Sequence, residues 1–553
     1  MAGLSNGAAA ATADGDQTHT ASQRYLSTRG EDENLSFEEV VLQGLGSDGG
    51  LFIPHEIPTA KDWQSWSELS FPELAFRVLS LYISPSEIPS ADLQDIINRS
   101  YATFRAEDVT PLVHLKDNLY LLELFHGPTF AFKDVALQFL GNLFEYFLVR
   151  RNEGKTGRVV GATSGDTGSA AIYGLRGKKD VSVFILHPKG RVSPIQEAQM
   201  ATVLDKNVHN LAVTGTFDDC QDIVKALFAD AETNKTLRLG AINSINFARI
   251  LAQITYYFYS YFSLAKKLPA FKVGDKLRFA VPTGNFGDVL AGYFAYRMGL
   301  PIDKLVIATN ENDILDRFWK TGRYEKQQQP QEGSEAAAAA AAAEATAAPA
   351  EGVLVKETLS PAMDILVSSN FERLLWFLAY EFAASAGMDD AWNKKQAGQE
   401  VVVWLRDLKT KAGFGPVYKD VLEAARRTFE SERVSDEQTL DTIRRTYGAT
   451  ADNYVLDPHT AVGVTAAERS IARAGTDMPH IALSTAHPAK FAGAVVTALQ
   501  GEAGFDFDNN VRPAEFVGLE EKERRVTQAE NDWRAVGALV RRQVEEELAA
   551  AEQ

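Results

Sequence analysis

The chain has 553 residues, of which 45% are hydrophobic and 24% charged, as in an ordinary globular protein with room for several domains. Its 56 basic and 74 acidic residues give a net charge of −18, which argues against a general nucleic-acid binder but permits a local basic pocket. A single cysteine, Cys220, excludes an intramolecular disulfide framework and a cysteine-rich metal site. No pair of histidines has the spacing of a zinc motif.

The N-terminal end carries no targeting signal that we recognise. Residues 1–22 are rich in alanine, glycine and threonine, which indicates a disordered tail without the basic start and apolar core of a secretory signal. The longest uncharged stretch, residues 250–265, is shorter than the roughly 20 apolar residues that a membrane-spanning helix needs. We therefore expect a buried helix there, no membrane association and a soluble cytoplasmic protein.

The chain then alternates between strand-like and helix-like runs. Amphipathic runs such as residues 92–104 predict helices in the first hundred residues, and a Pro- and Gly-rich turn at residues 47–58 interrupts them. Further on, strands are expected over 119–125, 158–164, 181–188 and 277–283, each followed by a helix, over 132–150, 168–177, 193–204 and 288–299. Strand-then-helix repetition predicts a parallel, doubly wound α/β sheet.

Residues 325–351 form a low-complexity insertion with eight consecutive alanines. The segment lacks a periodic apolar face, so we expect a surface insertion without catalytic work. The strand pattern is present on both sides of it, over 304–310 and 480–486. The charged stretch over residues 521–553 predicts a solvated C-terminal helix.

Two loops between a strand and a helix have the composition of anion sites. In Thr283–Asp288, unpaired N–H groups at a helix start and glycines that allow close approach form a candidate phosphate cradle, although a tight turn explains the spacing equally well. The loop matches neither the nucleoside-triphosphate nor the dinucleotide motif. The second loop, Gly161–Ser169, offers hydroxyls and amides suited to a carboxylate, or an ordinary N-capped turn. Within it we expect Asp166 to orient the loop.

Lys133 lies in apolar company, between Phe132 and Val135. Burial disfavours the charged amine and lowers the pKa of the lysine, and a neutral amine can form a Schiff base. The alternative is a lysine that extends to the surface or pairs with Asp134. Taken together, an apolar-site lysine, a phosphate-sized loop and a carboxylate-sized loop are what pyridoxal phosphate and an amino-acid substrate need.

On these residues the chain resembles the threonine synthase family, in the longer form typical of fungi and many bacteria, over about residues 24–510. The segments that carry the resemblance are YLSTRG (25–30), GLGSDGGLFIP (44–54), ELFHGPTFAFKD (123–134), GATSGDTGSAA (161–171), NSINFARILAQ (243–253), PTGNFGD (282–288), SPAMDILVSSNFERLL (360–375), DPHTAVG (457–463) and LSTAHPAKF (483–491). Nine collinear segments are far more specific than any one of them.

The resemblance implies a type II pyridoxal-phosphate fold, like that of the tryptophan synthase β subunit, with large and small doubly wound domains and an α-rich N-terminal domain. The expected division is an N-terminal domain over 23–108, a large domain over 109–155 and 270–515, a small domain over 156–269 and a C-terminal helical tail over 516–553.

The resemblance also assigns site residues. Lys133 would be the Schiff-base lysine, and Thr485 would hydrogen-bond the pyridine nitrogen of the cofactor. The cofactor phosphate would be lined by Gly284, Asn285, Phe286 and Asp288. Contacts to the substrate carboxylate or phosphate would come from Ser164, Thr167, Asn243 and Ser244. Arg249 is the expected partner of the substrate phosphate, because a guanidinium binds phosphate bidentately; its alternative is an ion pair on its own helix.

The implied reaction converts O-phospho-L-homoserine and water to L-threonine and phosphate, by γ-elimination and β-addition of water, in a carbon–oxygen lyase acting on phosphates. Two alternatives stay open: a phospholyase that releases 2-oxobutyrate, and a non-catalytic metabolite-binding homologue. The resemblance also implies a monomer.

Overall fold

Two sheets form the frame of the computed structural model, which describes residues 23–151, 157–163, 165–326, 355–384, 387–475 and 477–551. The larger is six-stranded, with the order β13 (Phe429–Arg433), β10 (Ile302–Thr309), β9 (Leu277–Pro282), β14 (His480–Ser484), β4 (Leu119–Glu123) and β3 (Leu112–Lys116). Its neighbouring strands are parallel except for β3 and β4, which pair antiparallel.

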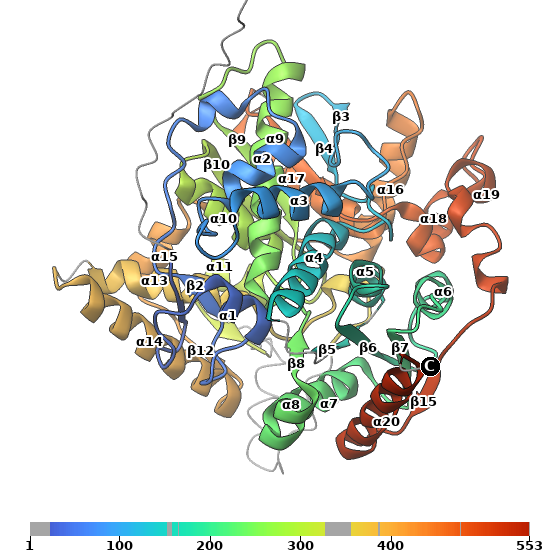
Figure 1. Ribbon diagram of the computed structural model, residues 1–553. Coiled ribbons are helices and arrows are strands. Elements are labelled where there is room, and N and C mark those ends of the chain that lie inside the picture. Colours follow the sequence, from blue (N-terminus) through green and yellow to red (C-terminus); the bar gives the residue numbers. More distant parts are fainter. Residues whose placement is uncertain are drawn as a thin grey trace, which may run out of the picture.

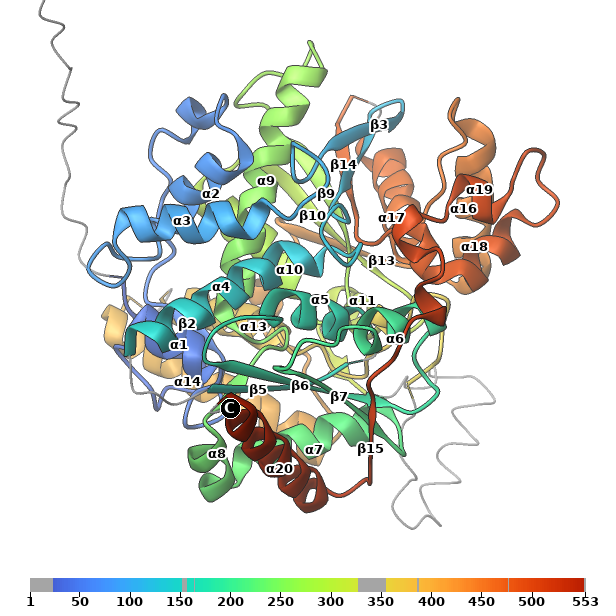
Figure 2. The same cartoon turned by 45° about the vertical axis from the view of Figure 1, so that its right-hand side comes forward.

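The smaller sheet is five-stranded and parallel throughout, with the order β15 (Thr527–Ala529), β7 (Val208–Val213), β6 (Val181–Pro188), β5 (Gly157–Ala162) and β8 (Leu239–Ala241). One face is covered by α5 (Asp166–Leu175) and α6 (Pro194–Ala201), and the other by α7 (Phe217–Ala229), α8 (Ala231–Leu237) and α20 (Trp533–Ala551) (Figure 2). Strands β5, β6, β7 and β8 are buried almost throughout and are mostly apolar, whereas the edge strand β15 is only partly buried. The predicted doubly wound α/β organisation is confirmed.

Three helices form the centre of the molecule: α4 (Lys133–Arg151), α9 (Phe247–Lys267) and α10 (Gly287–Met298). Helix α9 packs against both of the others. The uncharged stretch 250–265 lies inside α9, where nearly all its side chains are buried, as expected from the sequence. Among the described residues, no helix is both long and apolar enough to cross a membrane.

The N-terminal segment packs on these central helices. Strands β1 (Tyr25–Ser27) and β2 (Phe52–Pro54) form an antiparallel pair, followed by η1 (Trp63–Trp66) and α2 (Phe71–Leu79); α1 (Phe37–Gln43) lies between the strands. Helix α2 contacts α9, and α3 (Ser90–Tyr101) contacts α4 (Figure 1). Buried Glu372 joins this segment to the rest of the chain, since it accepts a hydrogen bond from Thr28 Oγ1 at 2.6 Å and pairs with Arg29 at 3.1 Å.

Most of the remaining elements surround the larger sheet. They are α11 (Ile314–Thr321), β11 (Tyr324–Glu325), η2 (Pro361–Met363), α13 (Phe371–Ala384), α14 (Asp390–Thr410), β12 (Gly413–Phe414), α15 (Lys419–Ala425), α16 (Asp436–Ala449), α17 (Pro458–Ala474), η3 (Pro488–Phe491), α18 (Ala492–Leu499), α19 (Phe507–Asn510), η4 (Ala514–Phe516) and η5 (Leu519–Glu521). Glu325, the first residue of the expected insertion, belongs to β11, which pairs with β12. Residues 327–351 of that insertion, and the expected tail at 1–22, lie outside the described residues.

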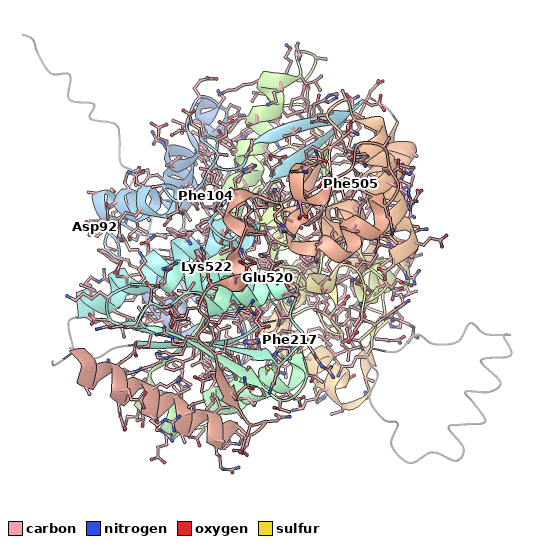
Figure 3. The ribbon with its side chains drawn as sticks, turned by 90° about the vertical axis from the view of Figure 1, so that its right-hand side faces the viewer. Asp92, Phe104, Phe217, Phe505, Glu520 and Lys522 are labelled. Atoms are coloured by element: carbon pink, nitrogen blue, oxygen red, sulfur yellow. The ribbon has the colours of Figure 1, made fainter. Side chains whose placement is uncertain are left out.

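The C-terminal end of the chain returns to the smaller sheet. From Phe505 it runs past Glu520 and Lys522 toward α20, the helix at the lower left of Figure 3. On the way, β15 adds an edge strand beside β7, and α20 packs against α7. Buried valines on one side of α20, at 536, 540 and 544, explain its docking. The expected C-terminal helix is therefore present, and a strand precedes it.

Candidate active site

A cavity of about 620 Å³ lies at the carboxyl ends of strands from both sheets. This is the edge at which α/β proteins bind their ligands. Every site residue expected from the sequence lines the cavity, except Ser164, which lies outside the described residues: Lys133, Thr167, Asn243, Ser244, Arg249, Gly284, Asn285, Phe286, Asp288 and Thr485. The structure thus brings together ten residues that are scattered over some 350 positions of the sequence.

Three neighbouring strands of the larger sheet supply one wall of the cavity. Strand β4 leads to Lys133, β14 ends directly before Thr485, and β9 leads into the β9–α10 loop, Thr283–Phe286. The backbone connects the first two, because the N–H of Phe132 donates to the carbonyl of Thr485 at 2.7 Å. Lys133 and Thr485 are therefore held next to each other although the sequence separates them widely.

The Lys133 side chain is 12% exposed, and its Nζ lies 5.5 Å from the centre of the Phe132 ring and 3.6 Å from Asp166 Oδ2. Burial lowers the pKa of Lys133 to about 8; Asp166 opposes this shift, and Arg249 and Lys490 add to it. The apolar environment expected from the sequence is present. A lysine with such a pKa is partly neutral near pH 8 and can act as a nucleophile or base.

Asp134, the alternative partner of Lys133, is engaged elsewhere. It accepts hydrogen bonds from the N–H and Oγ1 of Thr129, at 2.7 and 2.8 Å. Burial raises the pKa of Asp134 to about 6, although Thr129 lowers it. Asp134 therefore closes the turn that begins α4, in which Phe130 has a positive φ of 61°, and Lys133 is left facing the cavity.

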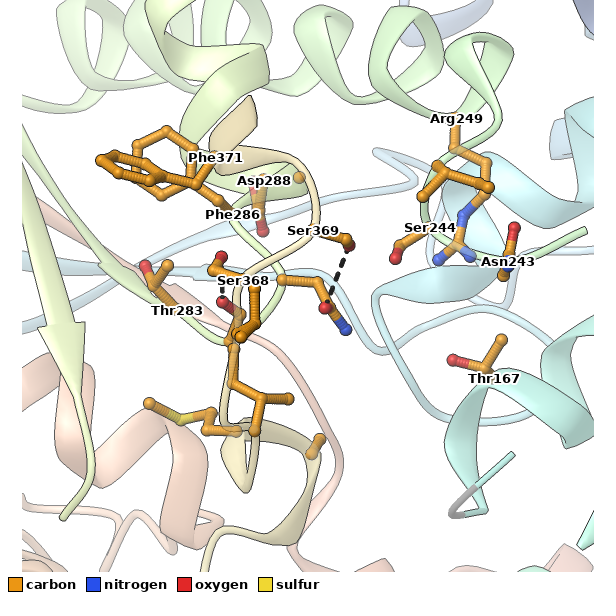
Figure 4. A pocket seen from close by; sticks show the side chains of 18 of the residues that line it. Thr167, Asn243, Ser244, Arg249, Thr283, Phe286, Asp288, Ser368, Ser369 and Phe371 are labelled. Carbon is orange, nitrogen blue, oxygen red and sulfur yellow. Dashed lines mark hydrogen bonds between the residues drawn. The ribbon is translucent and has the colours of Figure 1, made fainter. Parts of the chain in front are cut away.

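The backbone of the β9–α10 loop is closely approached by a neighbouring segment of the chain. A Cβ at Gly284 would lie 2.9 Å from the carbonyl oxygen of Ala362, so only glycine fits without a shift. Phe286 caps α10 in the left-handed region, with φ 62°. Ser368 Oγ donates to the Gly284 carbonyl at 2.7 Å, and Ser369 Oγ donates to Asn285 Oδ1 at 3.1 Å (Figure 4). The loop is thus braced by serines to which the sequence assigned no role.

Asp288, in the first turn of α10, is a buried carboxyl with one free oxygen. Its Oδ1 accepts from Tyr256 Oη at 2.6 Å and from Tyr257 Oη at 2.9 Å, and its Oδ2 has no hydrogen-bond partner in the described part of the chain. Burial raises the pKa of Asp288 to about 6, and the two tyrosines oppose that rise. A buried, unpaired carboxylate oxygen is costly, so this environment favours the protonated form of Asp288.

The opposite wall carries Arg249, Asn243, Ser244 and Thr167 (Figure 4). Arg249 is 4% exposed; its Nη1 donates to the Ile242 carbonyl at 3.3 Å, and its Nε has no hydrogen-bond partner among the residues described. Burial lowers the pKa of Arg249 to about 10. The first turn of α9 contains no acidic residue, so the alternative of an ion pair there is wrong. A buried guanidinium with an unused N–H is suited to an anionic ligand.

Asp166 does more than the sequence indicated. Its Oδ1 accepts from Gln196 Nε2 and from Lys490 Nζ, each at 2.8 Å, so it ties the β5–α5 loop to two other elements. Burial opposes its ionisation, but Lys490 and Lys133 hold the pKa of Asp166 well below its usual range. The sequence motifs that contain Asp166 and Lys490 were recognised. A motif, however, shows neither which side chains form an ion pair nor which of them are buried.

His459 is another lining residue that sequence reasoning missed. Its Nδ1 donates to Asp457 Oδ1 at 2.9 Å, and its Nε2 accepts the N–H of Ala362 at 3.1 Å. The histidine therefore fixes the segment that packs on Gly284. His459 belongs to the DPHTAVG segment, which was recognised in the sequence, but no role was assigned to any residue of that segment.

Comparison with known proteins identifies the family. Residues 24–101 match the model described as threonine synthase N terminus, residues 460–540 the model of the threonine synthase C-terminal region, and residues 103–367 that of pyridoxal-phosphate dependent enzymes. The chain is 55% identical over 546 residues to threonine synthase of Saccharomyces cerevisiae, across 96% of this chain and 99% of the relative. This chain belongs to the threonine synthase family.

Solved structures of the family agree with this assignment. The crystal structure of threonine synthase from yeast has a TM-score of 0.84 and 54% identity, covering 96% of this chain and 100% of that chain. Threonine synthase from Brucella melitensis with bound pyridoxal phosphate has a TM-score of 0.79 and 40% identity, covering 94% and 99%. The expected type II pyridoxal-phosphate fold with an additional N-terminal domain is confirmed, and the chain is an enzyme of the pyridoxal-phosphate-dependent lyase class.

Proposed function

We propose that the cavity converts O-phospho-L-homoserine and water to L-threonine and phosphate, with pyridoxal phosphate as the cofactor. The observation that supports this most directly is the shared cavity of Lys133, the β9–α10 loop and Arg249. One amine and two separate anion sites are what an enzyme needs when both its cofactor and its substrate carry a phosphate.

The residues present fit the cofactor. The missing Cβ of Gly284 lets the loop pack directly on Ala362, and the start of α10 presents unpaired N–H groups that suit a phosphate. Asn285, Phe286 and Asp288 line the same cavity, and Asp288 would reach a phosphate through its backbone N–H, because a carboxylate oxygen only accepts hydrogen bonds. A volume of about 620 Å³ is within the usual range for a small-molecule site.

Each end of the cofactor would be held by a different element. Lys133 would bind its aldehyde carbon, and Gly284, Asn285, Phe286 and Asp288 would hold its phosphate. Thr485 would hydrogen-bond the pyridine nitrogen. When bound, the cofactor supplies an electron sink for the substrate carbon that loses a proton. Because a hydroxyl cannot protonate that nitrogen as a carboxylate would, Thr485 would make the sink a milder one, and the reaction would depend more on the surrounding groups.

The substrate would be held by the opposite wall. Arg249 would bind its phosphate through two N–H groups, since a guanidinium matches two phosphate oxygens. Thr167, in the first turn of α5, would bind its carboxylate together with Ser164, which lies outside the described residues, and Asn243 and Ser244 would complete the wall. The Lys133 amine, whose pKa burial lowers to about 8, would take the Cα proton and then one from Cβ.

An absorbance spectrum tests this assignment. We expect the purified protein with cofactor to show a visible band that Lys133→Ala lacks, and to release phosphate and threonine in equal amounts from O-phospho-L-homoserine. Lys178→Ala is the matched control, because Lys178 pairs with Glu145 at 3.4 Å and does not line the cavity. Release of 2-oxobutyrate and ammonia in place of threonine would establish the phospholyase. Absence of any band after reconstitution would refute the enzymatic proposal.

We also propose a cytoplasmic monomer and the domain division given above, with β15 added to the small domain. The supporting observations are that one chain supplies the amine, the loops and the guanidinium of the cavity, and that the two sheets divide between the large and small domains. Light scattering during gel filtration should give a mass near the 60.6 kDa of one chain, and twice that mass would contradict the monomer.

A further inference from the structure

Lys490, in η3, is a buried lysine to which the proposed reaction gives no role. Its side chain is 0% exposed and does not line the cavity. Its Nζ donates to Asp166 Oδ1 at 2.8 Å and to the Thr129 carbonyl at 2.9 Å. Burying an ammonium group is expensive unless it is paired and hydrogen-bonded, so Lys490 depends on this carboxylate.

Asp166 lies between two lysines and contacts one of them more closely than the other. Its Oδ1 accepts from Lys490 and from Gln196 Nε2, each at 2.8 Å. Its Oδ2 faces Lys133 Nζ at 3.6 Å, which is beyond a normal hydrogen bond. The carboxylate is thus engaged by Lys490 behind the wall of the cavity and only loosely contacts the lysine inside it.

The charges around Lys133 come from several elements. Asp166 on α5 favours its ammonium form, whereas Arg249 on α9 and Lys490 on η3 disfavour it. Asp134, next to Lys133 on α4, is bonded to Thr129. His459 on α17 is hydrogen-bonded to Asp457 and to the N–H of Ala362.

Removing Lys490 would change two of these effects in the same direction. The repulsion between Lys490 and Lys133 would disappear, and Asp166 would be left with Lys133 as its nearest lysine. A carboxylate in direct contact with a buried ammonium raises its pKa by about 1–3 units. The neutral, reactive fraction of Lys133 at neutral pH would then fall by about tenfold for each unit of that rise.

We propose that Lys490 is a positioning residue, which keeps Asp166 ionised and occupied so that Lys133 presents a weakly held, reactive amine to the cavity. The same arrangement gives Asp166 a permanent counter-charge when the Lys133 amine is consumed in a bond to the cofactor. The proposal rests on the proposed role of Lys133, but its test measures the protonation of Lys133 and needs no turnover.

The test is competitive acetylation of the full chain, freed of cofactor, from about pH 6 to about pH 10. Mass spectrometry compares the labelling of Lys133 with that of Lys419, whose side chain is 84% exposed. We expect Lys490→Met to move the midpoint for Lys133 upward by about one pH unit or more, so that its labelling at pH 8 falls about fivefold or more. Lys490→Arg should keep the midpoint, and Lys178→Met is the control that leaves it unchanged.

A double variant distinguishes the proposed effect from a simple folding defect. Lys490→Met with Asp166→Asn removes both buried charges, and its midpoint should return to the wild-type value or below it, because no carboxylate remains to hold Lys133. An unchanged midpoint in a folded Lys490→Met protein would overturn the proposal. So would a midpoint that stays high in the double variant, which also decides the matter if the single variant fails to fold. Failure of the cofactor assignment would appear instead in the Lys133→Ala spectrum.

Discussion

The close packing of α4 against α5 can be tested by adding one methyl group between the two helices. Gly141 on α4 and Gly174 on α5 face each other with their backbones in contact. A Cβ added at Gly141 would lie 2.0 Å from the carbonyl oxygen of Gly174, and one added at Gly174 would lie 2.4 Å from that of Leu137. Because both obstacles are backbone atoms, no side chain can move aside. The helices would have to separate by about 1 Å to reach even a tight 3.0 Å contact.

We therefore expect Gly141→Ala to be strongly destabilising. Overpacking a buried contact costs about 1–3 kcal/mol, and a rigid backbone on both sides favours the upper end of that range. At about 2 °C per kcal/mol for a domain larger than 250 residues, the midpoint of thermal unfolding should fall by about 6 °C. Since α4 begins at Lys133 and α5 at Asp166, the same displacement should widen their 3.6 Å separation.

The control is Gly448→Ala, in the exposed last turn of α16, where an added Cβ meets nothing within 4 Å. Alanine favours helix over glycine by up to about 1 kcal/mol, so this variant should unfold at the wild-type temperature or slightly above it. Scanning calorimetry of both variants measures the difference. If Gly141→Ala unfolded within about 2 °C of the wild type, corresponding to less than about 1 kcal/mol, the helices would not be fixed by their glycines.

Two further predictions concern the walls of the cavity. Arg249→Lys should raise KM for O-phospho-L-homoserine and lower kcat, because an ammonium cannot bind phosphate bidentately; we expect kcat/KM to fall about tenfold or more, and unchanged phosphate release would exclude the role. Burial raises the pKa of Asp288 from 3.8 to about 6, so the folded state loses stability as pH rises from about 4 through about 6 and the carboxyl ionises. Asp288→Asn should remove this loss and gain up to about 3 kcal/mol over the wild type above pH 6, and thermal unfolding of the cofactor-free proteins that shows no such pH-dependent difference would contradict it.

Local patterns were sufficient to predict the strand–helix units. The strand expected over 158–164 is β5, and the helix expected over 132–150 is α4, because apolar periodicity is a property of neighbouring residues. The order of the strands in the sheet could not be predicted from the sequence. That β14 lies between β9 and β4 depends on pairing between residues hundreds of positions apart.

In the candidate site, too, some features could be predicted from local sequence and others depend on contacts between distant residues. Lys133, Thr485 and the β9–α10 loop follow strand-like runs directly, so their motifs could be recognised in the sequence. The partners of these residues could not be predicted. Asp134 lies next to Lys133 in the sequence and was a reasonable ion-pair partner, but the turn before α4 brings it to Thr129. Lys490 stands in a recognised motif, and only the folded chain places it against Asp166.

One buried carboxylate shows how far the geometry of the cavity depends on residues behind its wall. Asp457, the N-cap of α17, accepts hydrogen bonds from His459 through Oδ1 and from Thr460 through Oδ2. His459 in turn accepts the N–H of Ala362, beside the β9–α10 loop, and Thr460 Oγ1 accepts the N–H of Thr485 at 3.2 Å. The two proposed ends of the cofactor, its phosphate and its pyridine nitrogen, are thus positioned from the same residue. This requirement gives a physical reason for the DPHTAVG segment, which no single side chain of the cavity explains.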